Sequence, residues 1–183
     1  IRDRRVAAPA VQVEAWGSSG HRVIGVAAMR HLPGDLPAFL RTAGAAADVG
    51  EYSREPDRWK GAGQPHDRER DTAHFVDMDD QGRVMDARGM TMADLPHLKS
   101  EYDAALIRAG LDVDKAGYLP YAIMDAWQNL ERDFAYWRVL TAAEAREPDL
   151  AKQAWYRADR ERREQLIPVS YTHLRAHETS LHL

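Results

Sequence analysis

The stretch YLPYAIMDAWQNLERDFAYWRVL, residues 118–140, carries the strongest helical pattern in the chain. Large apolar residues recur along it at alternating steps of four and three, which is the spacing of one face of an α-helix. These residues are Ile123, Trp127, Leu130, Phe134 and Trp137. Pro120 falls in the first turn, where a missing N–H costs no helical hydrogen bond. The pattern predicts a long amphipathic helix whose aromatic face packs into the core.

Weaker patterns on both sides of this stretch predict further helices. The expected ranges are 19–31, a short helix from residue 35, and then 45–55, 97–109 and 149–166. Leu150, Ala154 and Ala158 share one side of the last helix, and its charged run 159–164 is expected to form a solvated face. Residues 57–80 are rich in Gly, Pro and Asp and are expected to form a long loop. Strand-like alternation is missing, so we expect an all-α fold.

Composition limits the possible functions. The 183 residues suit one domain, and no apolar run approaches the roughly 20 residues that cross a bilayer, so we expect no integral membrane segment. A net charge of −4 gives no general attraction to duplex nucleic acid, so any such contact must be local. Because the chain has no cysteine, a metal ion would need His, carboxylate or backbone ligands.

Residues 1–15 end in Val13-Glu14-Ala15, which fits the small-residue pattern of a secretory cleavage site before Trp16. The apolar core of a signal peptide is missing, so the segment is either a signal-peptide remnant or a disordered extension. The first interpretation predicts a secreted or periplasmic protein.

The chain changes character after Ile167. Residues 169–179 resemble translated sequencing-adapter DNA, of the kind found at the ends of truncated open reading frames. His173 and His177 are spaced like a helical metal pair, but we exclude them on this ground. We therefore expect a natural domain over residues 16–167, cut short by an artefactual tail over residues 168–183.

Four residues lie in loops or at the ends of the predicted helices, and taken singly they have ordinary structural explanations, such as a hydrophobic plug for Trp16 and a solvated first-turn residue for His21. Trp16 and His21 lie where a loop meets the helix expected over residues 19–31, with Ser18 or Ser19 as its N-cap. Asp57 follows the helix expected over residues 45–55, and His74 lies in the long loop within His74-Phe75-Val76-Asp77. Each residue alone is weak support for a site.

Taken together, the order and spacing of these four residues resemble the all-α superfamily of zinc-dependent phospholipases C and single-strand-specific nucleases. Residues 117–120, Gly-Tyr-Leu-Pro, also look like the start of a long helix in bacterial members. The resemblance covers residues 16 to about 167 and implies a multi-helix bundle with a trinuclear zinc site. It implies that Trp16 binds one zinc through its α-amino nitrogen and carbonyl oxygen, together with His21. Asp57 and His74 would bind a second zinc.

The resemblance implies a monomeric hydrolase that attacks phosphodiesters with zinc-activated water. Zinc lowers the pKa of bound water to about 7 and neutralises charge that builds on the phosphoryl oxygens. As a secondary role, Asp57 would orient the attacking water or act as its base. Phe75 matches a position of the family that can stack on a nucleobase. Phe75 fits equally well as a core aromatic residue that anchors the loop. We expect a nuclease acting on single strands; the alternatives are a phospholipase C and a non-catalytic helical binding module.

The remaining zinc ligands of the family lie in a His-x-x-x-Asp segment beyond the long helix pair. This chain has no match to that segment. The third zinc is left without protein ligands, so we expect an inactive or weakly active fragment. The amine of Trp16 is also an amide here, and cleavage after Ala15 would have to free it before it could bind zinc.

Overall fold

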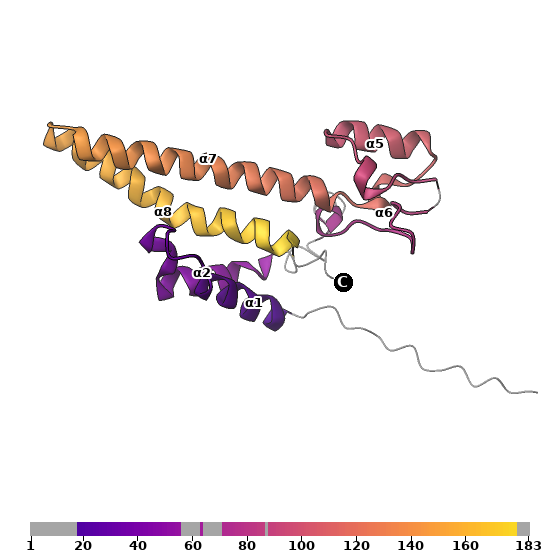
Figure 1. Cartoon of the computed structure of the whole chain (residues 1–183), viewed down its shortest axis with the longest axis horizontal. Coiled ribbons are helices and arrows are strands. Elements are labelled where there is room, and N and C mark those ends of the chain that lie inside the picture. The colour runs from indigo at the N-terminus through magenta and orange to yellow at the C-terminus, as the bar shows by residue number, and fades with distance from the viewer. Residues whose placement is uncertain (1–17, 56–62, 64–70, 87, 179–183) are drawn as a thin grey trace, which may run out of the picture.

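Two long antiparallel helices, α7 (Leu119–Arg146) and α8 (Leu150–Glu178), form the axis of the fold (Figure 1). The computed structural model describes residues 18–55, 63, 71–86 and 88–178. Within these residues the regular elements are all helices, so the all-α prediction is confirmed. None of the described helices is long and apolar enough to span a membrane.

Helix α7 is the helix predicted over residues 118–140. It begins as expected, with Pro120 in its first turn, and extends six residues beyond the predicted end at Leu140. Leu130 is buried in the main core, and Ile123, Phe134 and Trp137 pack against that core. Trp127 is 52% exposed, so the prediction that it is a core residue is wrong. It borders an open apolar cavity instead, because no described element covers that part of the face.

Helices α1 (Ser18–Arg30) and α2 (Ala43–Tyr52) form a second layer against α8 (Figure 1). Glycines let the two helices approach closely. A Cβ on Gly25 would lie 3.1 Å from the Val49 carbonyl oxygen, and one on Gly50 would lie 2.6 Å from the Val26 side chain. The short helix expected from residue 35 is only a 3-10 turn, η1 (Ala38–Arg41).

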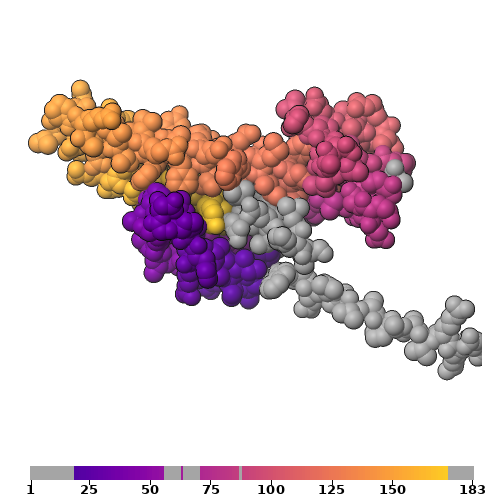
Figure 2. All heavy atoms as spheres, in the orientation of Figure 1, coloured from indigo at the N-terminus to yellow at the C-terminus, as the bar shows by residue number. Residues whose placement is uncertain are grey.

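A smaller cluster lies at the N-terminal end of α7, around Tyr102, Leu106 and Val84. It contains the 3-10 turns η2 (Asp71–His74) and η3 (Met92–Asp94) and the helices α5 (Lys99–Arg108) and α6 (Val113–Ala116). Two isolated β-bridges, Met78 to Val84 and Arg83 to Thr91, order the loop between the turns. Figure 2 shows the atoms of α5 and α6 gathered over a different stretch of the long helices from those of α1 and α2.

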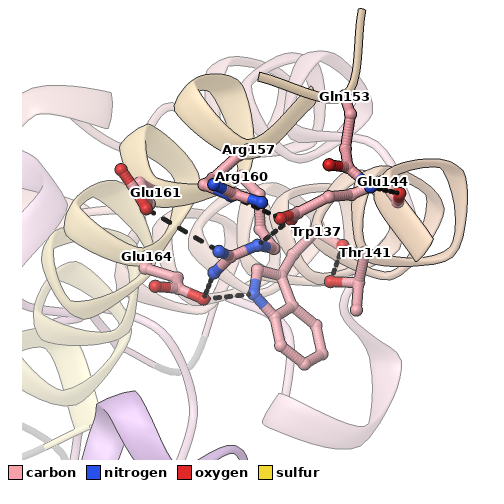
Figure 3. Close-up of polar contacts among 8 residues, drawn as sticks. All are labelled: Trp137, Thr141, Glu144, Gln153, Arg157, Arg160, Glu161 and Glu164. Carbon is pink, nitrogen blue, oxygen red and sulfur yellow. Dashed lines mark hydrogen bonds and ion pairs between the residues drawn. The ribbon is translucent and has the colours of Figure 1, made fainter. Parts of the chain in front are cut away.

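The inner face of α8 is polar, which corrects the prediction for its charged run. Arg160 donates to Glu144 on α7 at 2.8 Å and to Glu164 at 2.6 Å, and the indole N–H of Trp137 also donates to Glu164 at 3.0 Å (Figure 3). Leu150, on the side that also carries Ala154 and Ala158, is 79% exposed. The antiparallel packing of α8 on α7 places the face carrying residues 160, 164 and 167 inward.

Helix α8 continues through Pro168 to Glu178, whereas the predicted helix ended at Leu166. Ile167 is fully buried, and the Ser170 hydroxyl donates to the buried Asp133 carboxylate at 2.7 Å. The first residues after Ile167 therefore pack with the core of this chain. That residues 168–183 are foreign stays a prediction.

Candidate functional site

The structure describes three of the five predicted site residues: His21 on α1, His74 at the end of η2, and Phe75. His21 is half-buried in the first turn of α1, and His74 ends η2 with Phe75 directly after it. Trp16 and Asp57 lie outside the described residues. Within the residues that the structure describes, no group of three or more His, Cys, Asp or Glu side chains is arranged to hold a metal ion.

His74 is the best-defined candidate ligand. His74 is only 6% exposed, and its Nδ1 lies 3.2 Å from the backbone carbonyl oxygen of Asp71. A carbonyl can only accept, so Nδ1 is the donor in this hydrogen bond, and the neutral form of the ring has its lone pair on Nε2. Metal-binding histidines commonly donate their other ring N–H to a carbonyl in this way, which fixes the tautomer and the direction of the ring.

The N-terminus of α7 holds the backbone on both sides of His74. The N–H of Tyr118 donates to the Thr72 carbonyl at 2.8 Å, and the N–H of Leu119 donates to the Phe75 carbonyl at 3.1 Å. The first N–H groups of a helix have no partner within that helix, so they are free to bind a neighbouring turn. The N-terminus of α7 thus holds in place the turn η2, which ends at His74.

Gly117 makes this close approach possible. Its φ of 72° and ψ of 167° lie in a region that is essentially confined to glycine. A Cβ at this position would clash with the carbonyl oxygen of Phe75 and would lie 2.7 Å from the Cδ2 atom of its ring. Phe75 is half-buried beside Gly117, which fits the anchoring role. Stacking of Phe75 on a base stays a prediction.

Tyr102 is a neighbour of the site that the sequence did not reveal. Its hydroxyl donates to the carbonyl of Gly117 at 2.7 Å from a residue only 1% exposed. Burial raises the pKa of the Tyr102 phenol, so the group remains a donor throughout the working pH range. The sequence showed Tyr102 only as one residue of a predicted helix, and nothing in its spacing marked a partner 15 positions away.

Two of the acidic residues that follow the His74 turn, Asp79 and Asp86, are paired with arginines of their own loop. The backbone N–H of Arg83 lowers the pKa of Asp79, and the Arg83 side chain donates to the same carboxylate at 2.9 Å. The Arg88 side chain lowers the pKa of Asp86 to about 2. These two carboxylates form ion pairs with arginines and so stabilise the loop over residues 78–91, which also contains the two β-bridges.

A separate apolar cavity of about 580 Å³ lies between the α1–η1 segment and the long helices. Trp127, Phe134 and Trp137 form its wall on α7, and Met29 and Leu40 face them from the α1–η1 side. Neither His21 nor any residue of the His74 turn lines it. The cavity is large enough for a small ligand but is not part of the predicted zinc site.

Comparison with known proteins adds no relative: no family model, curated protein or solved structure matches this chain. Its function is therefore inferred from the residues and their geometry.

Proposed function

We propose that this chain carries part of the zinc site of a phosphodiester hydrolase that cleaves single-stranded nucleic acid with metal-activated water. The observation that carries the proposal is His74, a buried histidine whose Nδ1 donates to a backbone carbonyl and whose Nε2 is the potential ligand. The all-helical fold and the order of Trp16, His21, Asp57 and His74 support it.

In this proposal His21 and the backbone of Trp16 bind one zinc ion, and Asp57 and His74 bind a second. The zinc ions supply hydroxide at neutral pH and neutralise charge on the phosphoryl oxygens. Asp57 also orients the attacking water, as a secondary role for a carboxylate already bound to metal. Phe75 is placed next to His74, where an unpaired base could stack on it.

Two conditions limit activity in the chain as given. Trp16 can chelate zinc only after cleavage behind Ala15 frees its amine, which places the active protein in a secretory or periplasmic setting. A site with only Asp57 and His74 for the second zinc has fewer ligands than the three or four that stable zinc sites use. We propose that this chain hydrolyses phosphodiesters weakly or not at all, and that the ligands of the His-x-x-x-Asp type complete the site.

Phospholipase C activity is the alternative within the same chemistry. A lipid substrate would favour an apolar rim close to the zinc ligands. The large apolar cavity borders neither His21 nor the His74 turn, so it gives no reason to prefer a lipid.

The test is a zinc titration of the wild-type chain against two single variants. His74→Gln removes the proposed ligand, and His97→Gln removes an exposed histidine just before α5 as a matched control. We expect His74→Gln to weaken zinc binding by about tenfold or more, since altering groups around a zinc site typically costs about 10–100-fold in affinity, and His97→Gln to leave it unchanged. Equal zinc affinity in all three chains would overturn the proposal.

Hydrolysis assays on single-stranded DNA, a bis-aryl phosphate and phosphatidylcholine separate the substrate classes. We expect any turnover to favour single-stranded DNA over phosphatidylcholine and to disappear with His74→Gln. Stoichiometric zinc with strong turnover from the chain as given would contradict the proposal that its site is incomplete.

A further inference from the structure

A second hollow borders α1, and its charged residues are all basic. It has a volume of about 390 Å³ and is formed by α1, the end of η1 and the first turns of α2. Arg22, Arg30 and Arg41 line it, and none of its lining residues is acidic. Within the described part of the chain, none of these three arginines forms an ion pair with a carboxylate.

The local sequence explains why the hollow exists. Arg22, Val26 and Arg30 are spaced four residues apart, so they share one face of α1. The facing part of α2 presents only the short side chains of Ala43, Ala46 and Ala47. Alanine leaves room where a longer side chain would fill the space, so the guanidinium groups border an open and partly apolar depression.

The hollow is positively charged, although the whole chain has a net charge of −4. Clustered cations beside low-dielectric walls concentrate a positive potential and attract anions. Arginine in particular offers a planar fork of donors that matches phosphate oxygens. The sequence allowed only a local contact with nucleic acid, and this hollow is a place where such a contact fits.

The spacing of the arginines favours an extended polyanion over a single small anion. Arg22 and Arg30 are eight positions apart on α1, which corresponds to about 12 Å along the helix. Successive phosphates of one strand can contact both side chains along this length, whereas a single phosphate ion would require both long side chains to converge on one point at a cost in side-chain entropy. Arg22 also follows directly after His21, so one end of the hollow adjoins a proposed zinc ligand.

We propose that this hollow binds the phosphodiester backbone of a single strand next to the zinc site. The inference depends on the proposed function for its role in catalysis, because it makes the arginines the substrate-binding part of that same site. The binding itself depends only on Arg22, Arg30 and Arg41.

The experiment measures binding of a fluorescently labelled oligothymidylate by anisotropy, in EDTA, over a range of salt concentrations. The double variant Arg22→Gln/Arg30→Gln removes two charges from the hollow. The matched control Arg108→Gln/Arg146→Gln removes two exposed charges from α5 and α7, so both proteins have the same net charge. Circular dichroism establishes that each variant retains its helical content.

We expect the hollow variant to bind the strand about tenfold more weakly at low salt, and the control to change less than about twofold. The slope of log K against log salt should fall in magnitude by about 1.4 in the hollow variant, because each phosphate that an arginine neutralises on a single strand accounts for about 0.7 of that slope. Equal reductions in affinity in both variants, or no binding by the wild-type chain, would overturn the inference.

Competition by inorganic phosphate and by anionic lipid vesicles identifies the source of the phosphate. We expect the labelled strand to resist millimolar phosphate and neutral or anionic vesicles. Displacement by either competitor at matched phosphate concentration would contradict a nucleic acid strand as the ligand. Because EDTA removes zinc, strand binding is measured independently of the metal. Strand binding in EDTA, together with equal zinc affinity in the wild-type, His74→Gln and His97→Gln chains, would refute the proposed function and leave this inference standing.

Discussion

Removing the hydroxyl of Tyr102 tests whether the cluster at the start of α7 positions His74. Tyr102→Phe deletes the 2.7 Å hydrogen bond to the Gly117 carbonyl and keeps the aromatic ring. Because Tyr102 and Gly117 are both buried, the carbonyl loses its donor without gaining water. We expect a loss of about 1–2 kcal/mol in the free energy of unfolding. For a chain of this size that loss corresponds to a decrease in Tm of about 2–8 °C.

The local effect should exceed the global one. The Gly117 carbonyl that loses its hydrogen bond shares a peptide group with the Tyr118 N–H, which donates to Thr72, and the next N–H, of Leu119, donates to Phe75. We therefore expect faster amide exchange at Tyr118 and Leu119, and a changed imidazole nitrogen signal from His74. Global destabilisation alone would speed exchange across the whole core and would leave the His74 signal in place.

Tyr121→Phe provides a matched control within the same cluster. The two tyrosine rings lie 5.1 Å apart, and the Tyr121 hydroxyl donates to the Pro96 carbonyl at 2.8 Å. Its loss should also lower stability, since a carbonyl again loses a donor. It should not change the His74 signal, because Pro96 is not one of the residues that hold the turn η2.

The assay is two-dimensional NMR of the histidine side chains with amide exchange on the metal-free chain, alongside urea unfolding. Equal changes of the His74 signal in both variants, or none in Tyr102→Phe, would refute the positioning role of Tyr102. A Tyr102→Phe chain with wild-type stability would refute the magnitude assigned to the hydrogen bond.

Two further predictions concern the polar interface between α7 and α8. Arg160→Met removes its hydrogen bonds to Glu144 and Glu164 from a side chain that is 20% exposed, and we expect urea unfolding to give a loss of about 1–3 kcal/mol; Arg162→Met, at 69% exposure, should cost less than about 0.5 kcal/mol, and equal losses would contradict the assignment. Hydrogen bonds from Arg157 and then Arg160 hold the pKa of Glu144 below its usual 4.5, so its contribution is present above pH 4.5 and is lost as the pH falls through the lowered value. The stability difference between wild type and Glu144→Gln, measured by urea unfolding at about pH 6 and about pH 3, should therefore shrink at the lower pH.

Much of the helical layout could be predicted because it depends on local signals. The apolar period of residues 118–140 located α7, and α5 lies within the predicted range 97–109, followed by Gly110 with a φ of 71°. The errors come from contacts between distant residues. Trp127 belongs to the apolar stripe and is nevertheless half exposed. Its burial would depend on another element packing against that part of α7, which the sequence of α7 does not specify.

The polar inner face of α8 shows the same limit. Charged residues in a run are usually solvated, and only the partner helix distinguishes Arg160 from Arg162. Glu144 and the Trp137 indole on α7 provide the partners for Arg160 and Glu164. The sequence of α8 alone contains no sign of them.

For the candidate site, the sequence determined the chemistry that is available. The lack of cysteine leaves His, carboxylate or backbone groups as metal ligands. Zinc itself is implied only by the resemblance of the order of Trp16, His21, Asp57 and His74 to the phosphodiesterase superfamily, and it stays a prediction.

Tertiary structure decided how those residues are held. The tautomer of His74 depends on where the Asp71 carbonyl lies, and the turn depends on Gly117 accepting a backbone conformation that brings it against Phe75. The basic hollow likewise needs the arginines of α1 to face the alanines of α2. Local sequence cannot specify such pairings, because their energy arises only when segments far apart in the chain are packed together.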